Sequence, residues 1–271
     1  MIVRASNCTK HCIAGISHQK LVIETLTDGI LIIQLNHSNP HNPFNKQLES
    51  DLKEALRNGE SDDRIRAIVV TGGQSDRSFS AGGDFNEVKM LKGGPEVDAW
   101  IDRVIDLYIT ALLVTKPTVA AVNNHAIGIG FQLALMFDWR VGSHHSMFAM
   151  NELKNGISCT LGACILERVL GRNVMTELII GCERVSAEEA KGLKILNEIV
   201  QQEHLLTAAI SAATKLSAYP DTSYRNTKKS ANSNFVQDLK NVAEASKQAH
   251  RVAFASGANL QHFKSILGKN F

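Results

Sequence analysis

Two glycine-containing turns stand where an apolar run gives way to helix-forming sequence, and the first could bind a negatively charged oxygen. Ala81, Gly82, Gly83 and Asp84 follow the β-branched run 68–71, and Glu87 lies three residues after Asp84, as in a helix-capping box. Glycine has no Cβ to keep a ligand away from the backbone, and the first N–H groups of a helix are unpaired donors. These residues therefore predict an anion-binding turn, although a simple strand-to-helix turn explains them equally well.

The second turn repeats the arrangement. The apolar run 118–122 leads to Gly128, Ile129 and Gly130, which open another apolar helical segment. If each turn aims one N–H, from Gly83 and from Ile129, at the same atom, the pair forms an oxyanion hole. The glycine spacing is not that of a dinucleotide fingerprint, and the turn has no P-loop lysine.

The two turns, their order, and the later segment Asn-Glu-Leu-Lys-Asn-Gly-Ile at 151–157 resemble the crotonase (enoyl-CoA hydratase/isomerase) superfamily. The resemblance covers nearly everything from about residue 20 onward. Within that superfamily the chain is most similar to the carboxymethylproline synthases, the malonyl-CoA-using enzymes of carbapenem biosynthesis. The closer similarity depends on longer runs: 41–44, 78–89, 100–108, 130–132, 262–264 and 267–269.

The resemblance implies which side chains do the chemistry. Crotonases that hydrate enoyl-CoA use two glutamates, and at the first of these positions this chain has Gln132, whose amide cannot exchange protons near neutral pH. The second, Glu152, is kept. A single titratable group counts against hydration, which needs an acid and a base. It suits an enzyme that makes its carbanion by decarboxylation, and carboxymethylproline synthases also have Gln at this position.

The implied reaction begins with a malonyl-CoA thioester held by the N–H groups of Gly83 and Ile129. Loss of CO2 gives an enolate, which attacks pyrroline-5-carboxylate, the cyclic form of glutamate semialdehyde. Glu152 then hydrolyses the new thioester, as a base or as a nucleophile, and carboxymethylproline leaves. The alternative is another crotonase activity on a CoA thioester: hydration, isomerisation, decarboxylation or hydrolysis. No cofactor is implied, because the CoA thioester is the substrate.

Other side chains are expected to bind substrate. By spacing alone Trp100 and His250 are typical core residues of helices, and Glu152 a surface or capping carboxylate. The resemblance instead implies that Trp100 walls the pocket and that His250 contacts the carboxylate of the amino-acid substrate. Expected as substrate-binding residues are Gln132, Trp100, His250, Ala81, Gly82 and Asp84.

Composition limits the other classes of function. The chain has 271 residues, of which 44% are hydrophobic and 21% charged, with a net charge of +2. This balance gives no support for a nucleic-acid surface, and no apolar run approaches the length of a membrane span. Five cysteines, an odd number, favour reduced thiols in a cytoplasmic protein. Cys8 and Cys12 near two histidines suggest a metal site only weakly, because no second ligand pair with zinc spacing follows.

Alternation of strand-like and helical segments predicts an α/β fold with mostly parallel strands. The resemblance implies a crotonase (ClpP-like) spiral of repeated ββα units with two sheets. We expect a flexible N-terminal extension over 1–19, the spiral core over 20–204, and a C-terminal helical trimerisation region over 205–271. The expected assembly is a homotrimer or a dimer of trimers. A non-catalytic acyl-CoA- or RNA-binding member and a Rossmann oxidoreductase are rival interpretations, disfavoured by Glu152 and by the absence of a dinucleotide fingerprint.

Overall fold

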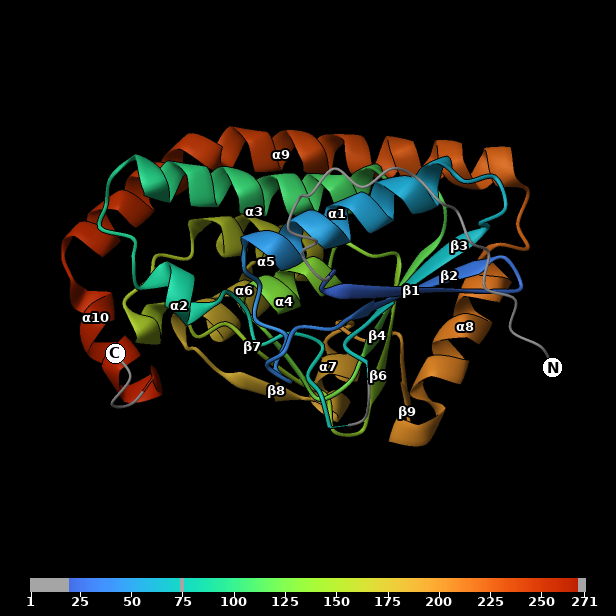
Figure 1. Cartoon of the computed structure of the whole chain (residues 1–271), viewed down its shortest axis with the longest axis horizontal. Helices are drawn as coiled ribbons and strands as arrows, with labels where there is room; N and C mark the ends of the chain where they lie inside the picture. The colour runs from blue at the N-terminus through green and yellow to red at the C-terminus, as the bar shows by residue number, and fades with distance from the viewer. Residues whose placement is uncertain (1–19, 74–75, 268–271) are drawn as a thin grey trace, which may run out of the picture.

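The computed structural model describes residues 20–73 and 76–267 (Figure 1). The predictions for 1–19, including Cys8 and Cys12, lie outside the described residues. The first element is a hairpin of β1 (Val22–Thr27) and β2 (Ile30–Leu35), which pair antiparallel. Asp28 and Gly29 both have positive φ, 48° and 77°, which is the backbone that a tight two-residue hairpin loop requires.

The main sheet has the strand order β1-β2-β3-β4-β6-β9. Its strands beyond the hairpin are β3 (Ala67–Thr71), β4 (Thr118–Val122), β6 (Trp139–Ser143) and β9 (Glu198–Val200). From β2 to β9 every pairing is parallel, as the sequence predicts. Strands β3 and β4 are buried on both faces, which explains why they read as continuous apolar runs.

Alternate residues of β3 enter two different cores. Ile68 and Val70 pack into the larger core, beneath α1 (Lys46–Ser61) and α3 (Pro95–Leu113). Ala67 and Val69 pack into a smaller core, which α8 (Leu205–Leu216) covers with Leu205, Ala209 and Ala213. Helices therefore cover both faces of the main sheet (Figure 1).

A second sheet has the order β5-β7-β8 and consists of three short strands, β5 (His125–Ile127), β7 (Met147–Ala149) and β8 (Arg184–Ser186). Strand β5 begins immediately after β4, where Asn124 has a positive φ of 47° and turns the chain. An isolated bridge between Ser80 and Ala126 ties the first glycine turn to this sheet. The two predicted turns are thereby brought next to each other.

The remaining short elements connect these layers. They are α2 (Phe85–Val88), α4 (Ile129–Ala134), η1 (Leu153–Asn155), α5 (Thr160–Leu170), α6 (Arg172–Met175), α7 (Ala187–Gly192), η3 (Gln202–His204) and α10 (Ala258–Leu267). Helix α6 continues directly into a π-helical turn, Thr176–Ile180.

The longest element is α9 (Asp221–Ala255), which lies side by side with α3 across the top of Figure 1 and also contacts α5. Its N-terminal half is fixed by Lys228, whose buried Nζ donates to the carbonyl of Lys116 at 2.8 Å and to Asp138 Oδ2 at 2.6 Å. Tyr224 donates to the same carboxylate oxygen at 3.1 Å. Helices α8 and α9 thus pack on the core of their own chain, and the division at residue 204 stays a prediction.

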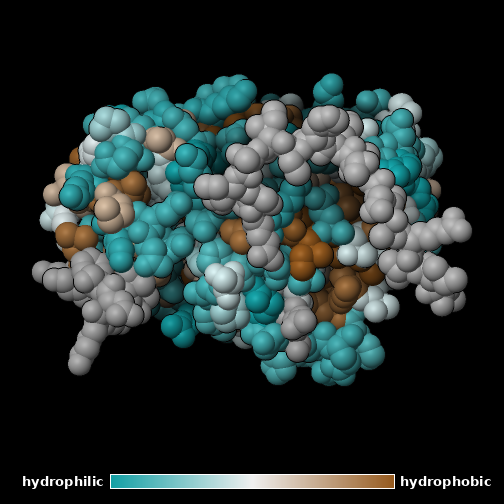
Figure 2. All heavy atoms as spheres, viewed as in Figure 1, coloured by the Kyte–Doolittle hydropathy of each residue, from teal (hydrophilic) through white to brown (hydrophobic). Residues whose placement is uncertain are grey.

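Within the described residues no helix is long and apolar enough to cross a membrane. Figure 2 shows that the face in view is mostly hydrophilic, with hydrophobic side chains gathered near its centre. The described cysteines, Cys159, Cys164 and Cys182, are all unpaired.

Candidate active site

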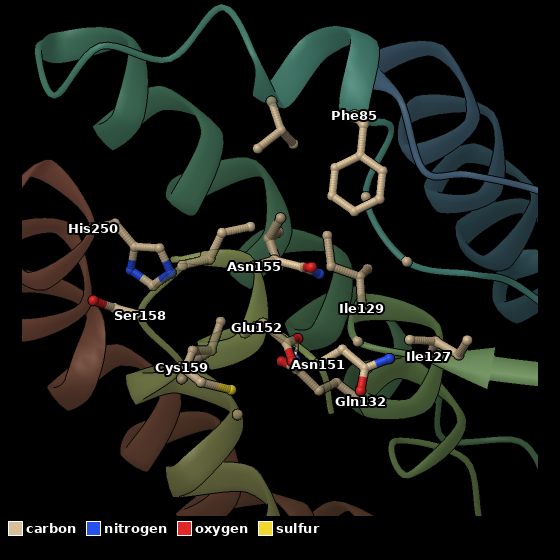
Figure 3. A pocket seen from close by; sticks show the side chains of 18 of the residues that line it. Phe85, Ile127, Ile129, Gln132, Asn151, Glu152, Asn155, Ser158, Cys159 and His250 are labelled. Atoms are coloured by element: carbon tan, nitrogen blue, oxygen red, sulfur yellow. Dashed lines mark hydrogen bonds between the residues drawn. The ribbon is translucent and has the colours of Figure 1, made fainter. Parts of the chain in front are cut away.

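A cavity of about 470 Å³ lies between the two glycine turns, helices α3 and α9, and the η1 segment (Figure 3). Eight of the nine predicted site residues line it: Ala81, Gly82, Gly83, Trp100, Ile129, Gln132, Glu152 and His250. They come from five separate stretches of the chain, so only the fold brings them together.

The first turn is shaped by its contacts to Phe44. Phe44 N–H donates to the carbonyl of Gly82 at 2.7 Å, and Asp84 N–H donates to the carbonyl of Phe44 at 2.9 Å. These bonds flank Gly83, so its own N–H must point to the opposite side, toward Ile129 and the cavity. Gly82 has φ +97°, a conformation that a residue with a side chain rarely adopts.

The second turn is formed where β5 meets α4. Gly128, with φ +54°, precedes Ile129, and Ile129 is the first residue of the helix. Its N–H therefore has no acceptor within α4. Across residues 20–73 and 76–267, neither the Ile129 N–H nor the Gly83 N–H donates a backbone hydrogen bond.

The two turns touch. Ile127 N–H donates to the carbonyl of Ser80 at 2.9 Å, and a Cβ placed on Gly82 would lie 3.0 Å from the Ile127 carbonyl and 3.8 Å from the Ile129 nitrogen. The structure therefore brings both predicted N–H donors to one wall of the cavity. Two such donors can stabilise an oxyanion on a bound thioester.

Glu152 lies in the cavity beside the second turn (Figure 3), where a Cβ placed on Gly128 would be 2.9 Å from its Oε1. Its Oε1 accepts a hydrogen bond from Gln132 Nε2 at 3.3 Å, while its Oε2 is buried and has no partner among the described residues. The backbone here is held by Ile157 N–H, which donates to the Glu152 carbonyl at 2.9 Å, and by Gly156 in the left-handed conformation. Burial raises the pKa of Glu152 from 4.5 to about 7, which suits a general base.

Gln132 is nearly fully buried on α4, and its amide is bonded at both ends. Besides the bond to Glu152, its Oε1 accepts from the hydroxyl of Tyr108 at 3.1 Å. No second carboxylate lines the described cavity, so Glu152 is its single acidic side chain. The cavity therefore lacks the paired acid and base that hydration needs.

Trp100 and His250 line the cavity side by side, with the Trp100 ring reaching the first glycine turn at Gly83. Their rings meet edge to face, with centroids 5.8 Å apart, and both side chains are buried. Both residues are therefore packed in the core and line the cavity, while their contact with substrate stays a prediction. His250 Nδ1 lies 2.7 Å from the carbonyl of Ser246, and burial lowers the pKa of the ring, so the neutral form is favoured.

Asp84 is the predicted site residue that the structure does not bring to the cavity. Its side chain accepts from the Asn86 N–H at 2.8 Å and caps α2, as the capping pattern predicts. Its contribution is to begin α2 at Phe85, and Phe85 and Val88 of that helix line the cavity.

Six polar residues of the lining were not predicted from the sequence, namely Asn151, Lys154, Asn155, Ser158, Cys159 and Arg184. Lys154 and Asn155 lie within the segment that carries the resemblance, so proximity to Glu152 was a usable signal. Arg184 lies on β8, far along the chain, and no local pattern marks it. Lys154 and Arg184 give the cavity positive charge suited to an anionic substrate.

Glu152 should also make stability depend on pH. Because its carboxyl has a higher pKa in the folded state than in the unfolded chain, wild-type stability is lost as pH rises from about 4.5 to about 7. Glu152→Gln, which does not ionise, is expected to be more stable than wild type by about 3 kcal/mol above pH 7, with the difference vanishing near pH 4.5. Urea unfolding at a fixed protein concentration measures this.

The control for that measurement is Glu188→Gln. Glu188 is exposed and its pKa is lowered, chiefly by its hydrogen bond with His144. Its replacement should therefore give no gain in stability at high pH. An unfolding free energy for Glu152→Gln that tracks wild type from pH 5 to 8 would contradict the assignment of a raised pKa.

Comparison with known proteins finds relatives in the superfamily that the sequence resembles. A model of the enoyl-CoA hydratase/isomerase family matches residues 25–266. The chain is similar to the carboxymethylproline synthase of Pectobacterium carotovorum subsp. carotovorum, at 45% identity over 93% of this chain and 100% of the relative. It is also similar to the mitochondrial enoyl-CoA hydratase of Pongo abelii, at 30% identity over 88% of this chain and 81% of the relative.

Solved structures with a similar fold match most of this chain. ThnE from S. clavuligerus matches with a TM-score of 0.72 and 32% identity, covering 83% of this chain and 98% of that chain. An enoyl-CoA hydratase from Bacillus halodurans matches with a TM-score of 0.81 and 22% identity, covering 90% of this chain and 99% of that chain, which supports the fold alone.

Proposed function

Because the chain belongs to the enoyl-CoA hydratase/isomerase family, we propose that its cavity binds a CoA thioester and catalyses the carboxymethylproline synthase reaction. The substrates are malonyl-CoA and pyrroline-5-carboxylate, and the products are carboxymethylproline, CoA and CO2. The observation that carries this proposal is a pair of unpaired N–H groups beside a single buried carboxylate in one cavity, with an amide, Gln132, where a second carboxylate would permit hydration.

The first step needs no base. The thioester oxygen of malonyl-CoA accepts hydrogen bonds from the Gly83 and Ile129 N–H groups. The bond between the malonyl methylene carbon and its carboxylate breaks, CO2 leaves, and the electron pair becomes an enolate whose oxygen carries the negative charge. Both donors bind this oxygen more strongly than the neutral carbonyl, so they lower the barrier.

In the second step the enolate carbon attacks the iminium carbon of pyrroline-5-carboxylate, and the iminium nitrogen takes the electron pair to become an amine. Trp100 closes one side of the cavity, and His250 contacts the substrate carboxylate. Burial lowers the His250 pKa, so the ring is neutral before substrate binds. The negative charge of the bound carboxylate then favours the protonated ring, which takes up a proton as the substrate enters. The product is a proline-like ring joined to an acetyl thioester.

In the last step Glu152 acts on the thioester through its unpartnered Oε2. As a base it removes a proton from water, the hydroxide adds to the thioester carbon, and the C–S bond breaks to release CoA. The same two N–H groups stabilise the tetrahedral oxyanion. With a pKa of about 7, the carboxyl gains its basic form as pH rises through neutrality, so hydrolysis should increase over that range.

Hydration is the less suitable assignment for this cavity, although enoyl-CoA hydratases are among the similar proteins. Addition of water across a double bond needs a proton donor as well as a base, and Gln132 can supply neither role. Simple decarboxylation of malonyl-CoA, without the second substrate, is the side reaction that this site would allow.

The test is incubation of the protein with malonyl-CoA and pyrroline-5-carboxylate, followed by mass spectrometry of the free acids and CoA esters. We expect carboxymethylproline and CoA in equal amounts, and no carboxymethylproline when either substrate is omitted. Acetyl-CoA as the sole product with both substrates present would assign the protein as a decarboxylase instead.

The assembly and the compartment are also part of this proposal. We propose a homotrimer or dimer of trimers in the cytoplasm. Exposed apolar side chains on and after α8, Leu206 and Tyr219, are consistent with contacts to another subunit.

A further inference from the structure

Tyr108 lies on α3 beneath the cavity and is fully buried. In the sequence it is one of several apolar positions of a long amphipathic helix. Its hydroxyl needs a hydrogen-bond partner at this depth, and the partner is Gln132 Oε1 at 3.1 Å. A chain of two hydrogen bonds therefore runs from Tyr108 through Gln132 to Glu152.

The direction of these bonds is fixed by what each group can do. An ionised carboxylate only accepts hydrogen bonds, so Gln132 must turn its NH2 toward Glu152. Its carbonyl oxygen then faces Tyr108 and needs a donor there. A phenol hydroxyl supplies that donor, and burial raises the Tyr108 pKa further, so the hydroxyl keeps its proton.

If the hydroxyl were absent, the amide could turn over. Its carbonyl oxygen would then face Glu152, an arrangement that suits only a protonated carboxyl, which can donate to it. The orientation of one amide therefore decides which protonation state of the carboxyl is favoured. A buried amide with no donor for its oxygen is free to take either orientation.

We propose that Tyr108 is a positioning residue that holds Gln132 as a hydrogen-bond donor to Glu152 Oε1, leaving Oε2 free to act on water. The role in hydrolysis rests on the proposed function; the orientation of the amide does not. In this role Gln132 does more than replace an acid, because its donated hydrogen bond favours the ionised form of the lone carboxylate in the cavity (Figure 3).

Several titratable groups surround Glu152 and belong to its electrostatic setting. They come from different elements that line or underlie the cavity: Tyr108, Lys154, Cys159, Arg184 and His250. Burial is the main cause that raises the Glu152 pKa, while its own backbone N–H and the nearby Cys159 thiol act in the opposite direction. Tyr108 alone in this set acts on Glu152 through Gln132.

The experiment follows the protonation of Glu152 directly. Protein labelled with 13C in its glutamate carboxyl groups is titrated by infrared spectroscopy, and the spectrum of Glu152→Gln is subtracted to isolate Glu152. Tyr108→Phe should raise the midpoint by about one pH unit, because a bond to an ionised group is weakened. Gln132→Met, similar in length but without the amide, should raise it at least as much.

The double variant decides whether Tyr108 acts through Gln132. In the Gln132→Met background, Tyr108→Phe should cause no further shift. Tyr224→Phe is the matched control, since it removes a hydroxyl bonded to a carboxylate, Asp138, outside the cavity, and it should leave the Glu152 midpoint unchanged. Thermal unfolding checks that each variant is folded.

An unchanged midpoint in Tyr108→Phe, or an equal shift with and without the amide of Gln132, would overturn the inference. The titration reports on Glu152 whether or not the protein makes carboxymethylproline. Failure of the proposed reaction with a shifted midpoint therefore removes the proposed function only, and an unshifted midpoint with an active enzyme removes only the role of Tyr108.

Discussion

Glu152→Ala is expected to stop release of free carboxymethylproline while the thioester adduct, carboxymethylprolyl-CoA, accumulates. Decarboxylation and carbon–carbon bond formation use the two N–H donors and need no base, so they should continue. Hydrolysis needs a group that activates water, and loss of a general base typically costs about 10²–10⁴-fold in rate. The two products are separated by liquid chromatography and quantified by mass spectrometry.

Two further variants sharpen this result. Glu152→Gln keeps the shape of the side chain and should behave like Glu152→Ala, which separates loss of the base from loss of volume. Glu188→Gln changes an exposed carboxyl that lies outside the cavity and should release product at the wild-type rate. Undiminished release of the free acid by Glu152→Ala would remove Glu152 from the mechanism.

Gly82→Ala is expected to impair the reaction at its first step. Gly82 has φ +97°, and its new Cβ would lie only 3.0 Å from the Ile127 carbonyl, so the alanine must push apart the two turns that carry the N–H donors. Misplacing one oxyanion donor costs about 10²–10³-fold in rate. The readout is CO2 release from malonyl-CoA in the absence of the second substrate.

The neighbouring glycine supplies a comparison. A Cβ on Gly83 meets nothing nearer than Ile129 Cδ1 at 3.4 Å, so Gly83→Ala keeps the backbone N–H and should lose far less decarboxylation. Gly192→Ala, where a Cβ meets nothing within 4 Å, controls for the cost of altering a glycine. Equal rates of CO2 release by Gly82→Ala and wild type would show that the turns do not form the proposed oxyanion site.

Gly82→Ala and Glu152→Ala should block different steps of the reaction, so the two variants together test the order of the steps. Gly82→Ala should leave malonyl-CoA largely unconsumed, whereas Glu152→Ala should consume it and stall at the adduct. A protein that merely binds acyl-CoA would show neither behaviour.

Local chemistry in the sequence marks the two turns, whereas Glu152 is implied only by the family resemblance, because its position alone indicates a surface or capping carboxylate. Glycines at strand ends, a capping aspartate and a recognisable segment around Glu152 can all be read along the chain. Their meeting in one cavity could be expected from the family resemblance, and the bridge between Ser80 and Ala126 is the contact that produces it.

Tyr108 and Arg184 could not be found in this way. Helical periodicity places Tyr108 on a buried face of α3 but cannot say that Gln132 lies opposite its hydroxyl. Arg184 reaches the cavity because β8 pairs with β7 in the small sheet, a contact between distant parts of the chain. For Asp84 the local pattern was the better guide. Its side chain caps α2, as the capping pattern predicts, and it does not line the cavity.

Helix α9 joins the cavity to the far end of the molecule. Near its N-terminus Lys228 is hydrogen-bonded to Asp138. His250 lies 22 residues later on the same continuous helix and lines the cavity. At about 1.5 Å per residue these two points are roughly 33 Å apart along a stiff rod. Any displacement of the helix at its anchored end would therefore shift the imidazole at the other, so mutations far from the cavity can alter the shape of one of its walls.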